Sequence, residues 1–320
     1  MTADRAATVA AHANNANDAR IANDANDAST RFLYGTRFGR ALLHAALALR
    51  VPAILGAFLR TPLSALYIKP FVRKKGIDMT GFEGMHFRSF NDFFTRKKAI
   101  TVDAAPTHFI APADSLLSVY PVTGDARFHI KGFDYSLQDF FEPARFGIQG
   151  AAAASLTKQF EGGTCLVFRL CATDYHRYCY VDSGRHEGEE GKNHFIPGSL
   201  YSVQPLAAEH FALYTKNRRS WTLLETAHFG KVAQIEIGAF SVGGIVNHKG
   251  SDAQATAHDT VGDTFSKGEE KGYFDLHGST IALLVQKDVL TLLPEIQAAR
   301  AQGCEYRVKI GECIGAAAAE

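Results

Sequence analysis

The sequence predicts an α+β protein, in which a helical region of residues 31–100 precedes a β-rich and mostly antiparallel domain of residues 101–320. Two apolar runs, 41–49 and 51–59, lie among basic residues and are separated by Arg50, a pattern that is typical of short amphipathic helices. After residue 107, short apolar segments alternate with Gly, Asp and Asn turns, which is typical of strands. With 320 residues, of which 46% are hydrophobic, the chain can bury a large core.

The first 30 residues differ in composition from the rest of the chain. They are rich in Ala, Asn and Asp, and the triplet Ala-Asn-Asp recurs at Ala16, Ala22 and Ala25. A segment with so few apolar side chains cannot bury enough surface to offset the entropy of folding. Residues 1–30 are therefore predicted to form a disordered tail.

Residues 31–75 carry nine basic side chains and no Asp or Glu. Each apolar run in this segment is shorter than the ~20 residues that span a bilayer, so helices lying in the membrane interface fit better. A basic residue near an anionic surface contributes about 1 kcal/mol to binding. The segment is predicted to dock on an anionic phospholipid membrane, and the alternative is a helical hairpin packed on the protein's own core.

The β-rich part begins after a short helical motif. Phe90, Phe93 and Phe94 have the i, i+3, i+4 spacing of a helix with one buried face. Strands are predicted at Cys165–Leu170, Val232–Gly238, Ser241–Val246, Tyr273–Leu276, Ile281–Val285 and Tyr306–Ile310. A helix is predicted from about Asp288 to Gln302.

Charge and cysteine content limit the function classes. The net charge of +1 gives no overall attraction to nucleic acid. Five cysteines without a Cys-x-x-Cys pair favour a reduced, cytoplasmic setting. The sequence shows no His/Cys cluster with metal-ligand spacing, so no metal is expected.

The tripeptide Gly278-Ser279-Thr280 falls at a bend between two predicted strands. Gly and Ser are common in ordinary turns, so the tripeptide alone indicates little. Gly278 has no Cβ and can leave its carbonyl open to attack, while the adjacent Ser279 hydroxyl becomes a nucleophile when a base removes its proton. The pair could therefore support an attack of the protein on its own backbone.

A series of motifs accompanies this tripeptide. They are Phe90-Asn-Asp-Phe-Phe-Thr-Arg96, Ala111-Pro-Ala-Asp-Ser115, Asp174-Tyr-His-Arg177, Pro197-Gly-Ser-Leu-Tyr-Ser-Val203, Asn217-Arg-Arg219, Ile237-Gly-Ala239 and Gly268-Glu-Glu-Lys-Gly-Tyr-Phe274. In this order, from about residue 85 to residue 315, the chain resembles the pyruvoyl-dependent phosphatidylserine decarboxylase family.

The resemblance implies that Ser279 attacks the Gly278 carbonyl, that the chain is cut between these residues, and that Ser279 becomes a pyruvoyl group. This cofactor would form a Schiff base with phosphatidylserine and act as the electron sink for its decarboxylation to phosphatidylethanolamine. The two self-cleaved chains would stay associated, either as a single pair or as a homodimer of such pairs. With the basic segment 31–75, the resemblance predicts a peripheral protein on the cytoplasmic face of a membrane.

The resemblance also assigns roles to single residues. Asp114 matches the carboxylate that assists activation of Ser279, and His176 matches the histidine that moves protons during decarboxylation. The family usually has Asp-Tyr-His-Arg-x-His and uses the second histidine as the base in cleavage, whereas this chain has Cys179 there. His277 is an alternative base, and so are His176, His194 and His248.

Two other functions fit the same sequence. One is a pyruvoyl-dependent decarboxylase of a free amino acid, against which the basic, apolar segment 31–75 argues. The other is a non-catalytic membrane-bound relative, which the departure at Cys179 would favour and the presence of Asp114, His176 and Ser279 would not.

Overall fold

The structure is a computed structural model that describes residues 28–186, 188, 191–239, 244–249, 264–276 and 279–318. Helix α2 (Ala28–Gly35) begins within the last three residues of the predicted tail, so the helical region starts at Ala28 rather than at residue 31. The rest of that tail, residues 1–27, lies outside the described residues, and so do His277 and Gly278.

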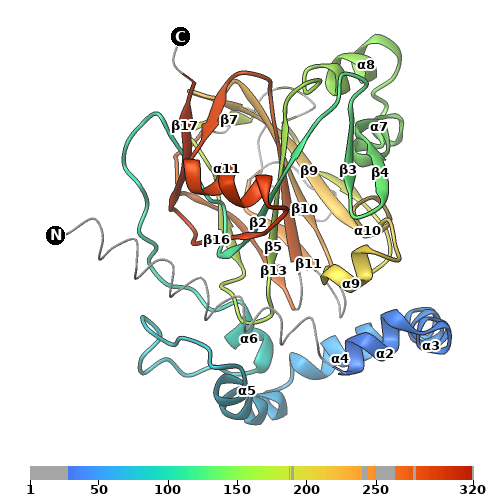
Figure 1. Ribbon diagram of the computed structural model, residues 1–320. Helices are drawn as coiled ribbons and strands as arrows, with labels where there is room; N and C mark the ends of the chain where they lie inside the picture. Colours follow the sequence, from blue (N-terminus) through green and yellow to red (C-terminus); the bar gives the residue numbers. More distant parts are fainter. Residues whose placement is uncertain are drawn as a thin grey trace.

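The N-terminal region is helical, as the apolar runs predict, and lies along one end of the β domain (Figure 1). After α2 come α3 (Arg37–Ala48), α4 (Val51–Leu59), the 3-10 helix η1 (Pro62–Tyr67), α5 (Ile68–Lys75) and α6 (Phe90–Phe94). The Thr36 side chain caps α3 by accepting a hydrogen bond from the Gly39 N–H. Arg50, with φ of 55°, separates α3 from α4, and Pro52 lies in the first turn of α4.

Most of the chain forms antiparallel strands around one large sheet. Its order is β12-β7-β9-β10-β14-β5-β2-β16, with β8 paired to β9. The strands of this sheet are β2 (Ser115–Pro121), β5 (Thr164–Leu170), β7 (Gly184–His186), β8 (His194–Ile196), β9 (Arg219–Thr226), β10 (Lys231–Ile237), β12 (Thr264–Phe265), β14 (Ser279–Val285) and β16 (Tyr306–Val308). The α+β prediction is confirmed.

Three smaller sheets accompany the large one. Their orders are β1-β17-β15, β11-β13-β6 and β3-β4. Their strands are β1 (His108–Ile110), β3 (Arg127–Ile130), β4 (Phe133–Ser136), β6 (Arg177–Cys179), β11 (Gly244–Asn247), β13 (Glu270–Asp275), β15 (Leu290–Leu292) and β17 (Cys313–Ala317). All strand pairings in the described part of the chain are antiparallel.

Two apolar cores cover the two faces of the large sheet. Along β14, Ala282 and Leu284 belong to the first core, and Ile281 and Leu283 belong to the second. The alternation follows from the two-residue period of a strand, so Ser279 faces the second core. The first core is closed by α7 (Leu137–Phe141), η2 (Pro143–Phe146), α8 (Gly150–Lys158), α9 (Pro205–Ala208) and α10 (Leu213–Lys216), and the second by α11 (Pro294–Ala301).

One predicted helix is wrong over its first part. The segment expected to be helical from Asp288 instead forms β15, and α11 begins only at Pro294. Proline favours the first turn of a helix and holds the preceding residue in extended backbone, as Leu293 shows with ψ of 146°. The other predicted strands are present with end shifts of a few residues, and residues 241–243 of one of them lie outside the described residues.

Candidate active site

The ends of three neighbouring strands lie side by side at one end of the large sheet. They bring together the segments that carry Asp114, His176 and Ser279. Ser279 begins β14 and pairs with Leu170, the last residue of β5. β5 leads directly into the loop that contains His176, and its other neighbour, β2, begins one residue after Asp114. The antiparallel register therefore collects residues that are far apart in the sequence.

Ser279 has the environment of a buried nucleophile. Its side chain is 1% exposed, and its Oγ has no hydrogen-bond partner among the described residues. An unpartnered buried hydroxyl is costly and calls for a functional explanation. The Gly278 carbonyl, which Ser279 would attack, lies outside the described residues.

The backbone bends sharply just before the predicted cleavage site. Leu276 has φ of 57° and is completely buried against Phe90, Phe93 and Phe94 of α6. The left-handed conformation of a non-glycine residue costs about 1–3 kcal/mol and persists only where surrounding packing enforces it. The phenylalanine motif therefore holds a strained turn two residues before Gly278.

His176 is buried between this motif and the sheet. Its ring centroid lies 3.9 Å from that of Phe94, and its Nδ1 lies 2.9 Å from the Asp174 carbonyl oxygen. A carbonyl can only accept a hydrogen bond, so Nδ1 carries the proton and Nε2 is the basic nitrogen of the neutral ring. This tautomer suits a group that accepts a proton at Nε2 and returns it.

Two arginines connect α6 to the histidine loop, a positioning role that the sequence reasoning missed. Arg96 contacts the carbonyl oxygens of Thr173 and Asp174, and burial lowers its pKa. Arg177 donates to the Thr95 carbonyl at 2.7 Å and to the Glu270 carboxylate on β13 at 2.7 Å. The motif spacing reveals the buried helix face, but it could not reveal which loop the arginines hold.

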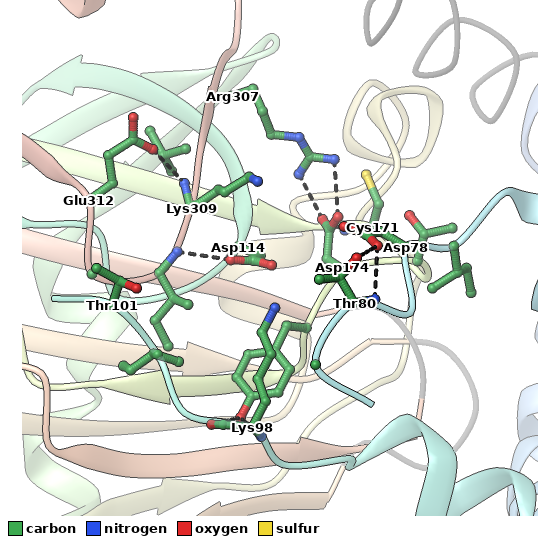
Figure 2. Close-up of a pocket in the computed structure, with 18 of the residues that line it drawn as sticks. Asp78, Thr80, Lys98, Thr101, Asp114, Cys171, Asp174, Arg307, Lys309 and Glu312 are labelled. Carbon is green, nitrogen blue, oxygen red and sulfur yellow. Dashed lines mark hydrogen bonds and ion pairs between the residues drawn. The ribbon is translucent and has the colours of Figure 1, made fainter. Parts of the chain in front are cut away.

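Asp114 lies in the wall of a pocket of about 1880 Å³ (Figure 2). Its Oδ1 accepts a hydrogen bond from the Ile310 N–H at 2.9 Å. Asp174 lines the same pocket and forms a bidentate ion pair with Arg307, with both N–O distances 3.0 Å. Burial nevertheless raises the pKa of Asp174, because desolvation outweighs the Arg307 charge.

The environment of Cys179 opposes its role as the base. Its side chain is fully buried, and burial raises the pKa of the thiol to about 12. At pH 7 a thiol with that pKa is ionised to about one part in 100,000. The Cys179 N–H donates to the Pro112 carbonyl, so the residue does lie beside the Asp114 segment.

We therefore expect Cys179→Ala to cut itself at nearly the wild-type rate, because the thiol is protonated at neutral pH. The fraction of cut chain is measured on denaturing gels during expression and after purification. Cys165→Ala, a buried thiol on the opposite face of the sheet, is the control. Loss of cleavage in Cys179→Ala alone would show that the thiolate is the base despite its burial.

The fold places the other candidate bases in different surroundings. His194 stacks on Trp221 at 3.9 Å, in the first core and thus on the opposite face from Ser279. His248 is bound to Glu270 through a 2.7 Å contact, and its side chain is 41% exposed. His277 lies outside the described residues but is next to Gly278 in the sequence, so it remains a candidate base together with His176, which the described structure places beside the bend.

A buried ion pair connects the strand before the bend to the large sheet. The Lys271 ammonium on β13 lies 2.8 Å from the Glu236 carboxylate on β10, and both side chains are 0% exposed. Asn247 completes the cluster, with its Oδ1 3.0 Å from the Lys271 ammonium. Glu236 pairs with Ile281 and therefore shares the face of Ser279.

We expect Lys271→Met to lower the free energy of unfolding by about 3–5 kcal/mol, because Glu236 would remain buried without its cation. Adding Glu236→Leu should recover most of this loss, since an apolar pair of similar volume is tolerated. Urea unfolding in a Ser279→Ala background keeps a single uncut chain. A single variant no less stable than the double variant would contradict the expected coupling.

Comparison with known proteins identifies the family. The family model for phosphatidylserine decarboxylase matches residues 90–316, which include every site residue described above. A phosphatidylserine decarboxylase proenzyme 2 of Clostridium acetobutylicum is 35% identical over 289 residues, which cover 89% of this chain and 90% of that protein.

Two further relatives agree. A phosphatidylserine decarboxylase proenzyme of Clostridium perfringens is 34% identical, covering 88% of this chain and 90% of its own length. One from Desulfitobacterium hafniense is 35% identical, covering 89% of this chain and 90% of its own length. On this evidence the chain belongs to the phosphatidylserine decarboxylase family, a family of decarboxylase enzymes.

Proposed function

We propose that the chain is a proenzyme that cuts itself between Gly278 and Ser279 and then decarboxylates phosphatidylserine to phosphatidylethanolamine on a membrane. The observation that carries this proposal is the buried Ser279 hydroxyl at the start of β14, which has no hydrogen-bond partner among the described residues and lies three residues after the strained Leu276. Family membership and the proenzyme names of the relatives support the same reading.

The surroundings of Ser279 fit its conversion to a pyruvoyl group. The Oγ makes no hydrogen bond to another described residue, so its loss would break no such bond. A pyruvoyl carbonyl supplies an electron sink for the carbanion that forms when CO2 leaves. His176 would move the proton that this chemistry requires, and the Phe94 ring and the Asp174 carbonyl would hold its imidazole in place.

Cleavage would leave two chains that are interleaved rather than separate. In the C-terminal piece, residues 279–320, β14 lies between β10 and β5, β16 pairs with β2, and β17 pairs with β1. Arg169 of the larger piece forms a 3.0 Å hydrogen bond to Glu305 of the smaller one. We infer that the two pieces stay associated through these pairings.

The N-terminal helices supply the surface that would face lipid. Eleven of the twelve exposed large apolar side chains in the described part of the chain lie between Phe32 and Tyr67. The opposite face is packed, because Tyr34 and Leu43 belong to the first core. The region thus fits both interpretations of the sequence, because one face packs on the protein's core and another face is exposed and could contact lipid.

Membrane depth is limited by the helices themselves. No single helix in the described residues is long and apolar enough to span a bilayer, although α3 and α4 reach that length and hydropathy as a pair bent by 65°. An ion pair connects the end of α4 to β13, the strand before the proposed cleavage site, because the Arg60 guanidinium lies 2.5 Å from the Asp275 carboxylate. Docking would therefore bring the active site close to lipid headgroups.

We expect the triple variant Ile54→Asn, Leu63→Asn and Leu66→Asn to bind anionic vesicles at least about a hundredfold more weakly, because it loses three lipid contacts. These side chains are 68%, 68% and 77% exposed, so the fold should tolerate the changes. Sedimentation with phosphatidylglycerol vesicles measures binding, and raised salt should weaken it. Unchanged binding of the triple variant would exclude this face as the docking surface, and Met85→Asn is the control.

The substrate is tested by CO2 release from the purified, cut protein. Phosphatidylserine in mixed micelles and free serine are compared at equal concentration, and we expect release from the lipid only. Release from free serine alone would favour the amino-acid decarboxylase. A single uncut band with no release from either compound would favour the non-catalytic relative.

A further inference from the structure

Three side chains with metal-binding chemistry converge where the loop before β1 meets β17. They are Asp103, His108 and Cys313, and one ligand atom from each lies within 4.8 Å of the other two. The Asp103 Oδ1 is 2.9 Å from the His108 Nδ1. Their positions in the sequence gave no sign of a site, because Cys313 is about two hundred residues from the other two.

The geometry suits a small transition-metal ion. Zinc binds carboxylate oxygen and imidazole nitrogen at about 2.0–2.2 Å and thiolate sulfur at about 2.3 Å, so tetrahedral ligand atoms are roughly 3.3–3.6 Å apart. The three atoms here lie within 4.8 Å of one another, so side-chain rotations would have to bring them to that spacing. One carboxylate and one thiolate would balance the charge of a divalent cation.

The fold constrains this cluster from several sides. β1 and β17 pair directly, with a bulge at Phe109 and Ile110 that brings the chain beside Cys313. The Asp103 carboxylate also accepts the Ala105 N–H at 3.0 Å, which fixes the loop. The Lys267 ammonium closes the same loop by donating to the carbonyls of Ala105 and His108, at 2.6 and 2.7 Å.

An ion could reach the cluster from solvent. Asp103 and Cys313 line the large pocket that also contains Asp114. The Asp103 and His108 side chains are 30% and 39% exposed, which leaves room for a water as a fourth ligand. Asp103 and Glu312 place negative charge near the thiol, and Lys267 places a positive charge there.

We propose that Asp103, His108 and Cys313 form a binding site for a zinc-type divalent transition-metal ion. After the proposed cleavage, Asp103 and His108 would belong to the large piece and Cys313 to the small one. The bound ion would then bridge the two chains through its coordinated ligands, in addition to the β1–β17 pairing. This joining role rests on the proposed self-cleavage, whereas binding of the ion does not.

Cobalt(II) alone is the probe, because a cobalt–thiolate bond gives a near-ultraviolet charge-transfer band. It is added to reduced, chelator-dialysed full-length protein, both cut and as uncut Ser279→Ala. We expect one equivalent to bind with this band in both forms, and zinc to displace it. Cys313→Ser should abolish the band, and Asp103→Asn and His108→Gln should each weaken binding by more than about tenfold.

Two matched variants separate the site from chance binding. Cys304→Ser removes an exposed thiol, and His129→Gln removes a histidine that also contacts a carboxylate, that of Asp134, at 2.8 Å. Both should keep the full cobalt signal. Absence of the band in the unmodified chain, or its persistence in Cys313→Ser with a native circular dichroism spectrum, overturns the proposal. If binding occurs only in Ser279→Ala, the joining of the two cut chains is wrong.

Discussion

Ser279→Ala is expected to give a single uncut chain with no detectable decarboxylation. The substitution removes one buried oxygen that has no hydrogen-bond partner among the described residues, so the fold should lose little stability. It removes the nucleophile for cleavage, and the same oxygen is the group whose elimination would allow Ser279 to become a pyruvoyl group. Denaturing gels and CO2 release from phosphatidylserine measure the two losses.

The control for this variant is Ser118→Ala, which removes a hydroxyl from β2 in the same sheet. It should be cut and should release CO2 as the unmodified chain does. A Ser279→Ala protein that is still cut at this bond would show that another group is the nucleophile. Circular dichroism of both variants excludes misfolding as the reason for an uncut chain.

His176→Ala is expected to be cut normally but to lose turnover by about 10²–10⁴-fold, the usual contribution of a positioned acid or base. The physical reason is the fixed imidazole, whose Nδ1 is held by the Asp174 carbonyl and whose ring lies on Phe94. Cleavage is measured on gels and turnover by CO2 release from the cut protein. An enzyme that both cuts and decarboxylates at the normal rate would contradict the role assigned to His176.

The complementary variant is His277→Ala, which tests the remaining candidate base. If His277 serves cleavage, this variant stays largely uncut while His176→Ala is cut. If His176→Ala is uncut and His277→Ala is cut, His176 has taken over the role of the family's second histidine. His194→Ala serves as the control, because its ring lies on the opposite face of the sheet.

Much of the fold could be predicted because local patterns decide it. The apolar runs at 41–49 and 51–59 lie in α3 and α4, as predicted. Phe90, Phe93 and Phe94, which have helical spacing, form the buried face of α6. The apolar segment at 281–285 became β14. The helix expected from Asp288 begins only at Pro294, because proline favours the first turn of a helix and the preceding residue is extended.

The site could be predicted only in part, because its geometry depends on contacts distant in the sequence. The motifs identified Asp114, His176 and Ser279, but only the register of β2, β5 and β14 shows that their segments meet. The Lys271–Glu236 pair and the cluster at Cys313 gave no signal, because neither has a spacing rule in the sequence. The burial that opposes Cys179 as a base is likewise a property of the folded chain.

The mass of the intact purified protein is the sharpest test of the proposed self-cleavage, because it reports cleavage and cofactor formation together. We expect two masses, one for residues 1–278 ending in a normal carboxyl group and one for residues 279–320. The second should be lighter by one ammonia than a peptide that begins with serine, as conversion of Ser279 to a pyruvoyl group requires. A single mass for the whole chain, or a small piece that begins with an unmodified Ser279, would contradict it.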